Sequence, residues 1–568
     1  MQRNPLLGNG FRVVMACLSA ALIAVVLPMQ DSHADRADRM ALGRLSSPLL
    51  LEVQTALAQL GFYNGSVDGQ FTIETGHSIR RYRQTHRLPD TGHDWQPLME
   101  HLNAQVRQGR GVKSGLDRAR NNQIAAARSL LDEGLEIQQR LQDVPSREAG
   151  KVEVYECFVL PTADCLFASA LQAVDKIERE EYRNWALRDL IREQALSDRV
   201  DAAFAGLKKL SDPRLIFVAL REITEGLAES DRIEQALETA RLIPEPNQRA
   251  KAITVVVDAM LTQRKFLEAR GLGSEIETLL GRQRNVIERI LLMASLAEKF
   301  VMAGDRGYGA ELLERAVGDL AGVLDGPARD ASWATIAKVR LALGDTEAAS
   351  RAMGRIEDET TRVMAVTADA AEKARLSKSK YALRITASIG GLRYRTLALT
   401  EVAQGRHQLG DLKGARDMLG RAERLVSEID SPYAGSFSLA RIAATYAKLG
   451  LFEPAVRVVG EIDDDDLRAR LYWNVSRQLR ENDRTGEALV LEAKALDVAS
   501  KAKSTFDRTS LLGNFAIDLA RDERLVLGRD VFERAMRESR KIKTGWWRVR
   551  ALARLARVLY VIERNGHI

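Results

Sequence analysis

The chain has three groups of residues whose side chains could do chemistry: two cysteines, a run of histidines and a run of aspartates. None of them forms a recognisable catalytic pattern, since the sequence has no Gly-x-Ser-x-Gly elbow, no His-Glu-x-x-His pair and no phosphate-binding loop. An enzyme needs a positioned nucleophile or a paired acid and base in a cleft. A helical repeat occupies nearly everything after residue 165, so no compact domain is left to hold a catalytic carboxylate. We therefore expect that the protein is not an enzyme.

The histidines and aspartates have the residue types of metal ligands but not the spacing. The histidines at positions 77, 86, 93 and 101 contain no i, i+4 pair and have no companion pair of cysteines. The four aspartates at 463–466 lack the Gly and the distal Glu of a calcium-binding loop. We expect a solvated turn at the aspartates, no metal site and no cofactor.

The first 34 residues have the features of a secretory signal peptide. Arg3 and Arg12 supply the positive charge, and the apolar run that follows, residues 13–27, is too short for a comfortable membrane span. Small residues precede a cut before Asp35. Cys17 is an alternative lipid-acceptor site, although the apolar run continues past it. No later stretch offers 18 apolar residues, so we expect a soluble mature protein in the periplasm.

The two later cysteines, Cys157 and Cys165, have seven residues between them. In an exported protein the oxidising compartment favours a disulfide. Free buried thiols are the alternative; a metal site lacks further ligands nearby. We predict a disulfide that closes a short loop at the entrance of the repeats, and we expect this loop to cap an exposed array end.

Composition limits the function. Hydrophobic residues make up 45% and charged residues 29% of the 568-residue chain, and only 13 residues are proline. The net charge is +6, or +5 once residues 1–34, with two basic residues and one acidic residue, are removed. A protein of this size that is so nearly neutral gives no indication of binding nucleic acid. The chain is also too long for one compact core, so we expect several domains or a repeat array.

One short stretch, from Val53 to Gly92, contains a compact pattern of helices and turns. Its apolar positions 53, 56, 57 and 60 follow the spacing of an amphipathic helix, and Gly61 stands where the helix should end. Asn-Gly and Asp-Gly turns follow, then a second helix that includes Ile79 and Tyr82 and that Leu88-Pro89 terminates.

The motif Leu-Gly-Phe-Tyr-x-Gly-x-Val-Asp-Gly-x-Phe at 60–71 resembles the peptidoglycan-binding-like domain, a small three-helix module, over about residues 49–102. Thr72-Ile73 replaces the usual Gly-Pro pair, and Tyr82-Arg83 replaces the usual Phe-Gln pair. The resemblance implies that the module binds peptidoglycan. The residues that we predict for this contact are Tyr63, Asp68, Phe71, Arg80 and Tyr82, whose aromatic rings could pack on sugar or peptide faces.

A basic, Gly-rich stretch at 108–115 opens the segment between this module and the cysteines. Either the segment is a spacer that lets the two parts move separately, or its helical portion packs on the repeats. The domains that we predict are a signal peptide at 1–34, a short linker at 35–48, the module at 49–102, a helical linker at 103–163 and a repeat array at 164–568.

The array is marked by an arginine that recurs before each apolar helical run. The positions are 183, 214, 249, 289, 329, 362, 395, 468, 508 and 548, with Gly435 in one arginine slot. The common spacings are 33 and 40 residues, which differ by two helical turns. Each unit reads as a helix pair whose turn lies 15 residues after the arginine, at Gly304, Gly344 and Gly410 for example. We predict that the second helix of the 40-residue units is two turns longer.

Small residues recur with the turn, as in Ala337, Gly344 and Ala349. The same offsets return at 403, 410 and 415, and at 443, 450 and 455. This spacing resembles the tetratricopeptide repeat, although the usual Trp and Pro are mostly missing. The resemblance implies an all-α solenoid, a right-handed superhelix whose groove is lined by first helices and binds a protein. We expect Trp546-Trp547 to begin its closing helix; a ligand-stacking role is the alternative.

The recurring arginines have two interpretations. They could form a charged rail for an acidic partner, or each could begin a first helix and pair with an acid between repeats, such as Asp212, Asp358 or Asp463. Regular spacing within a repeat favours the structural role. Taken together, the sequence predicts a cell-wall-associated adaptor that binds peptidoglycan and an unidentified protein. The alternative is a peptidoglycan hydrolase of the lytic glycosidase type, or an activator of one.

Overall fold

The computed structural model describes residues 48–63, 73–88, 96–107, 157–281, 286–320, 327–429, 432–543 and 545–566. Every regular element in these residues is an α-helix, which confirms the all-α class. Among the same residues no helix has the length and apolar character needed to cross a membrane.

The N-terminal module consists of three helices. They are α3 (Pro48–Gln59), α4 (Ile73–His86) and α5 (Gln96–Arg107). Gly61 ends the first of them with φ +77°, a left-handed conformation that glycine adopts without steric cost.

The array consists of first helices that alternate with second helices along the chain. The first helices are α8 (Glu180–Ala195), α10 (Pro213–Glu229), α12 (Pro246–Thr262), α14 (Val286–Ala303), α16 (Pro327–Ala342), α18 (Glu359–Arg375), α20 (Leu392–Gln408), α22 (Pro432–Lys448), α24 (Asp465–Glu481), α26 (Thr505–Arg521) and α28 (Gly545–Gly566). The second helices are α9 (Val200–Leu207), α11 (Ile233–Arg241), α13 (Phe266–Gly281), α15 (Arg306–Leu320), α17 (Thr346–Met353), α19 (Ser379–Ser388), α21 (Leu412–Val426), α23 (Phe452–Gly460), α25 (Thr485–Lys501) and α27 (Leu525–Ser539). One further helix, α7 (Ala163–Asp175), precedes them all.

The lengths of the second helices follow the predicted rule. In the 40-residue units these helices have 15 to 17 residues, whereas in the shorter units they have 8 to 10. Two extra turns return the side chains to nearly the same face, so long and short units stack on one another without a break in the core.

Each first helix from α8 to α26 is followed by a residue with a left-handed backbone, which in most of them lies at the predicted turn. Glycine fills this position at 304, 344, 410 and 450, with φ between +73° and +107°. In other units a polar residue, such as Asp198 or Asp483, adopts the same conformation. Asp345 and Asp411 then cap the second helix by accepting a hydrogen bond from a backbone N–H three residues on.

The recurring arginine lies at the fourth residue of most first helices and reaches back across the turn. Arg249, Arg395, Arg468 and Arg508 each donate to the backbone carbonyl six residues earlier, between 2.5 and 3.4 Å away. Arg508 also pairs with Glu538 of α27. The arginines therefore join the end of one unit to the start of the next, which supports the structural role over the charged rail. Acids pair with five of the recurring arginines as well, among them Arg329 with Glu357 between two units.

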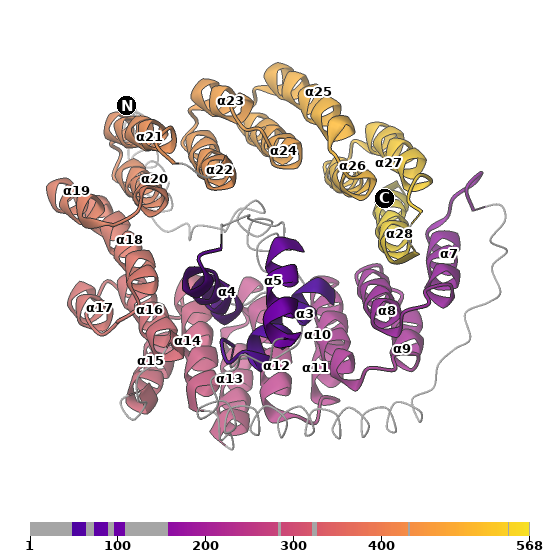
Figure 1. Cartoon of the computed structure of the whole chain (residues 1–568), viewed down its shortest axis with the longest axis horizontal. Coiled ribbons are helices and arrows are strands. Elements are labelled where there is room, and N and C mark those ends of the chain that lie inside the picture. Colours follow the sequence, from indigo (N-terminus) through magenta and orange to yellow (C-terminus); the bar gives the residue numbers. More distant parts are fainter. Residues whose placement is uncertain are drawn as a thin grey trace, which may run out of the picture.

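The array closes into a ring, and this corrects the expectation of an open superhelix with free ends. Figure 1 shows the first helices on the inside and the second helices on the outside. Helix α28, the first helix of the C-terminal unit, packs against α8. This contact is as extensive as the contact between the neighbouring first helices α26 and α28. Helix α7 packs along α28 as a second helix packs along its own first helix, so the N-terminal helix completes the C-terminal unit (Figure 1). The predicted exposed end of the array is absent from the described residues.

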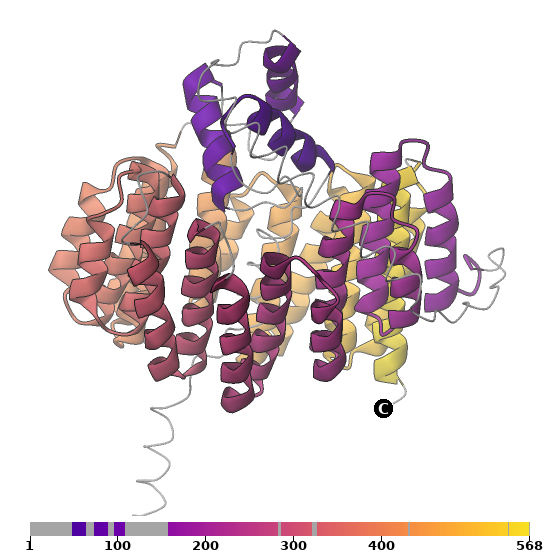
Figure 2. The ribbon, with the colours of Figure 1, turned by 90° about the horizontal axis from the view of Figure 1, so that it is seen from below.

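The module lies over one face of the ring (Figure 2). Helix α4 contacts α16, and α3 contacts α8. Arg80 Nη1 of α4 donates a 2.9 Å hydrogen bond to the hydroxyl of Tyr394 in α20. The module therefore rests on at least three first helices that lie far apart in the sequence.

Gly405 of α20 is expected to tolerate no side chain, because a Cβ there would lie 2.3 Å from the carbonyl oxygen of Ala371 in α18. Gly405→Ala should lower the free energy of unfolding by ~1–3 kcal/mol through overpacking. Gly271 of α13 is the matched control, since nothing lies within 4 Å of its added Cβ. Gly271→Ala should raise the same free energy by ~0.5–1 kcal/mol. Urea unfolding measures both, and an equal shift in the two variants would contradict the close contact of α18 and α20.

Candidate functional site

The core of the module is built from its three helices and the residue that follows the first turn. Val53 and Leu57 of α3, Tyr82 of α4 and Leu102 of α5 are all fully buried, and Tyr63 is 1% exposed. The structure thus places two of the predicted ligand-contacting residues, Tyr63 and Tyr82, inside the core. Because both rings are buried, neither presents a face on which a sugar could pack. Their contribution to binding is to hold neighbouring residues in place.

A buried polar cluster fixes Tyr63 in this core. Gln54 Nε2 lies 3.2 Å from the hydroxyl of Tyr63 and 3.2 Å from that of Thr75, and the two hydroxyls are 3.4 Å apart. All three side chains are buried. Because buried polar groups are costly without partners, these bonds hold α3 and α4 in one relative position.

An aromatic and histidine cluster lies beside this core, partly open to solvent. Phe62 meets Tyr82 edge to face with ring centroids 5.0 Å apart. The ring of His86 is tilted against both neighbours, with its centroid 4.4 Å from that of Tyr82 and 5.0 Å from that of His101. The hydroxyl of Tyr82 is 2.8 Å from Nδ1 of His101. Arg81 lies 5.6 Å from the centroid of Phe62 and donates to its carbonyl.

Burial changes the acid–base behaviour of this cluster. It raises the pKa of Tyr82 to about 12, so the hydroxyl stays neutral and can hydrogen-bond in either direction. It lowers the pKa of His86, with a smaller lowering from His101, so the neutral imidazole is favoured. A neutral aromatic surface beside one cation, Arg81, suits packing on a sugar or peptide face rather than acid–base chemistry.

The remaining predicted residues fall outside this cluster. Arg80 is in the interface with the ring, through Tyr394, and Asp68 and Phe71 lie outside the described residues. Phe62 and Arg81 were not among the predicted residues. Phe62 stands inside the motif that carried the resemblance, directly after the helix-ending Gly61, and this position is the sequence signal that could have identified it.

No group of three or more His, Cys, Asp or Glu side chains in the described residues is arranged to hold a metal ion. His86 and His101 make ring contacts with each other and with Tyr82. In the aspartate run, Asp464 caps α24 by accepting from the N–H of Leu467, and Asp466 pairs with Arg470. Only Asp463 and Asp464 therefore lie in the exposed connection that we expected, whereas Asp465 and Asp466 form the first turn of α24.

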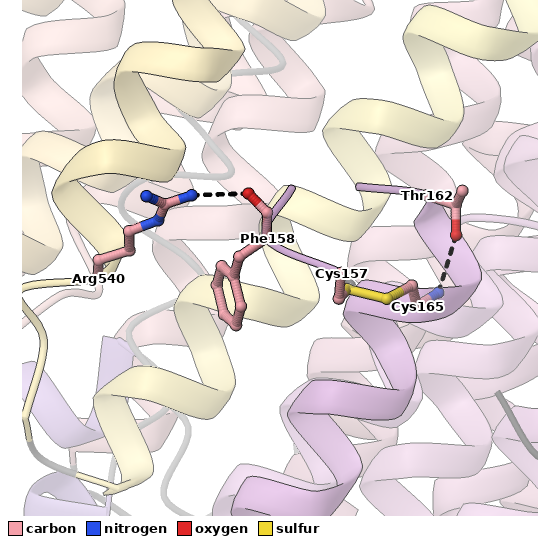
Figure 3. Close-up of a disulfide and its surroundings, with 5 residues drawn as sticks. All are labelled: Cys157, Phe158, Thr162, Cys165 and Arg540. Carbon is pink, nitrogen blue, oxygen red and sulfur yellow. Dashed lines mark hydrogen bonds between the residues drawn. A yellow bond between two sulfur atoms is a disulfide. The ribbon is translucent and has the colours of Figure 1, made fainter. Parts of the chain in front are cut away.

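The disulfide is present at the junction of the ring. Cys157 and Cys165 are joined, with Cα atoms 5.5 Å apart, at the start of α7 (Figure 3). Thr162 in the loop caps α7 by accepting from the N–H of Cys165 at 3.2 Å. The carbonyl of Phe158 accepts a 2.7 Å hydrogen bond from Arg540, the residue after α27 (Figure 3). The loop thus touches the C-terminal unit instead of covering a free end.

Comparison with known proteins identifies the module. Residues 46–93 match the family described as "Putative peptidoglycan binding domain". The chain therefore carries a peptidoglycan-binding-like domain followed by an array of helix pairs. No curated protein matches the chain.

Two solved structures are similar to parts or most of the chain at low identity. The crystal structure of Ton1535 from Thermococcus onnurineus NA1 is 15% identical, with a TM-score of 0.27, over 57% of this chain and 97% of that one. A circular tandem repeat protein with novel repeat topology is 14% identical, with a TM-score of 0.19, over 92% of this chain and 99% of that one.

Proposed function

We propose that the protein is an exported adaptor of the cell envelope, without enzymatic activity, that binds peptidoglycan through its module and a protein partner through its ring. The observation that carries the proposal is the match of residues 46–93 to a peptidoglycan-binding family. The leader-like residues 1–34 and the disulfide support export to the periplasm, because disulfides persist in oxidising compartments.

The ring supports the second half of the proposal. Its first helices form a continuous inner face, and three of them border an open hollow of about 220 Å³ lined by residues of α16, α18 and α20, among them Lys338, Glu372 and Gln404. Helical repeats commonly offer such a face to a partner. The module, held on one side of the ring through Arg80, would bring that face to the wall.

The wall contact is tested by pelleting with purified peptidoglycan. The whole protein is expected to pellet, and a variant with Phe62→Ala and Arg81→Ala should remain largely in solution, because both side chains border the partly open cluster of the module. Phe437→Ala and Arg393→Ala, a matched cation–π pair on the ring, is the control and should pellet normally. Equal pelleting of all three proteins, or of none, would contradict the assignment of wall binding to the module.

The same incubation separates the adaptor from the alternative, a peptidoglycan hydrolase or its activator. An adaptor should release no soluble wall fragments. Release that disappears when one Asp or Glu is replaced would favour the hydrolase, and release only when a second envelope enzyme is added would favour the activator.

A further inference from the structure

The inner face of the ring has a recognisable set of positions on each first helix. They lie 2, 6, 9 and 13 residues after the recurring arginine, which places them on one side of the helix. Lys338 of α16 and Glu298 of α14 each lie nine residues after the arginine of their own helix, and the two side chains pair at 2.6 Å. Arg441 of α22 and Glu401 of α20 each lie six residues after the arginine slot of their own helix, and the two side chains pair at 2.8 Å. Most residues that line the hollow described above lie at these offsets, and none belongs to a second helix, so this side is the inner face.

Helix α28 is unusual because arginine fills three of these positions in succession, at 550, 554 and 557. On no other first helix of the described residues are the three positions all basic. Two of these arginines join the ends of the ring. Arg550 Nε lies 2.5 Å from Asp189, and Arg557 lies 3.5 Å from Glu193, both acids of α8.

Arg554 does not take part in this pairing. Its Nη1 donates a 2.9 Å hydrogen bond to the hydroxyl of Ser510 in α26, on the side away from α8. No carboxylate oxygen of the described residues lies within the 4 Å of an ion pair with it. A guanidinium has five donors, so one bond to a serine leaves most of its capacity unused.

Charges of both signs act on Arg554, and arginines outnumber acids among them. Arg192, Arg470 and Arg557 act on it as like charges, and Glu193 is the principal opposing charge. Burial and these neighbours lower the pKa of Arg554 to about 10, although the group remains charged at neutral pH. Arg470 pairs with Asp466, and Arg192 and Arg557 both pair with Glu193. The charge that lacks a partner is therefore that of Arg554.

We propose that Arg554 is the centre of an anion-binding site on the inner face of the ring, which takes a carboxylate of an acidic peptide segment. A carboxylate would accept two charge-assisted hydrogen bonds from the guanidinium and relieve its repulsion by the neighbouring arginines. This inference rests on the protein-partner half of the proposed function and names the chemistry of the partner.

The acids of the neighbouring helices α8 and α10 decide between ligand classes. Asp189, Glu193, Glu222 and Glu225 all act on Arg192, beside the proposed site. A polymer with a charge on every unit, such as a nucleic acid, would meet these carboxylates and be repelled. A peptide with one or two carboxylates and basic residues on either side complements both the arginine and the acids around it.

The test uses the whole protein and the synthetic peptide Lys-Gly-Glu-Glu-Gly-Lys. Binding to the native state should raise the Tm of the wild-type protein, by about 1–2 °C once the peptide reaches about ten times its Kd. The Arg554→Gln variant should lose this rise, which corresponds to a loss of affinity of about tenfold or more. The same peptide with Gln in place of Glu should have no effect on either protein.

Two controls separate binding from folding. Without peptide, Arg554→Gln should keep or raise the Tm, because it removes a guanidinium from among like charges. Arg534→Gln on the outer helix α27, which breaks the exposed pair with Asp530, should respond to the peptide as the wild type does.

Three results would overturn the proposal. They are no peptide response in the wild type, an equal response in Arg554→Gln, and a response to inorganic phosphate through Arg554 that the peptide does not share. Pelleting with peptidoglycan depends on the module, so a failure here leaves the wall-binding result unaffected and the two proposals fail separately.

Discussion

Leu166→Asp should open the ring where its two ends meet. Leu166 lies in α7 and is fully buried, within the same core as Leu555 and Leu559 of α28. A carboxylate there would be buried without a partner, and we expect the local unit to lose ~3 kcal/mol or more of stability. Because α7 is the second helix of the last unit, its release leaves an apolar face of α28 exposed.

The opening should appear at both ends of the sequence together. Hydrogen exchange measured by mass spectrometry is expected to rise in α7, α8 and α28 and to change little in α16 and α18, on the far side of the ring. Small-angle scattering should show a larger radius of gyration. Gln172→Asp places the same charge on the exposed side of α7 and is the control. A rise confined to α7 and α8 would mean that α28 does not depend on α7.

Replacing Cys157 and Cys165 together by Ser should loosen the same junction more mildly. The disulfide spans only eight positions in sequence, so its entropic contribution is below the ~3 kcal/mol expected for a loop of about 15 residues. Its loop nevertheless reaches the C-terminal unit. Phe158 accepts a hydrogen bond from Arg540, and Arg540 and Arg548 lie 5.6 and 6.0 Å from its ring.

This pattern differs from the expectation of a loop that caps an exposed array end, because the loop also contacts the C-terminal unit. We now expect exchange to rise in α7, at the end of α27 and in the first turns of α28. Addition of a reductant to the wild-type protein should reproduce the change, whereas the doubly substituted protein should not respond to it. A rise that stops at α8 would show that the loop acts on the N-terminal side alone.

The sequence by itself determined the helices, their turns and their lengths. These features depend on neighbours a few residues apart. Apolar residues three and four positions apart set each helix, a residue 15 positions after the arginine adopts the left-handed conformation in most units, and seven extra residues add two turns to a second helix. The disulfide and the three-helix module could be predicted from the sequence for the same reason. Cys157 and Cys165 are close along the chain, and so are the motif residues of the module, such as Gly61 and Tyr63.

Closure of the ring was decided only by tertiary structure. A small rotation between successive units accumulates along the array, and no single unit records whether the sum brings α28 back to α8. For this reason α7 could be read as the entrance of the array but not as the partner of α28, nearly 400 positions later. The burial and contacts of individual side chains could not be predicted from the sequence either. Tyr63 and Tyr82 could have faced a ligand or the core, and Arg554 gained Arg192 of α8 as a like-charged neighbour only when the two ends of the chain met.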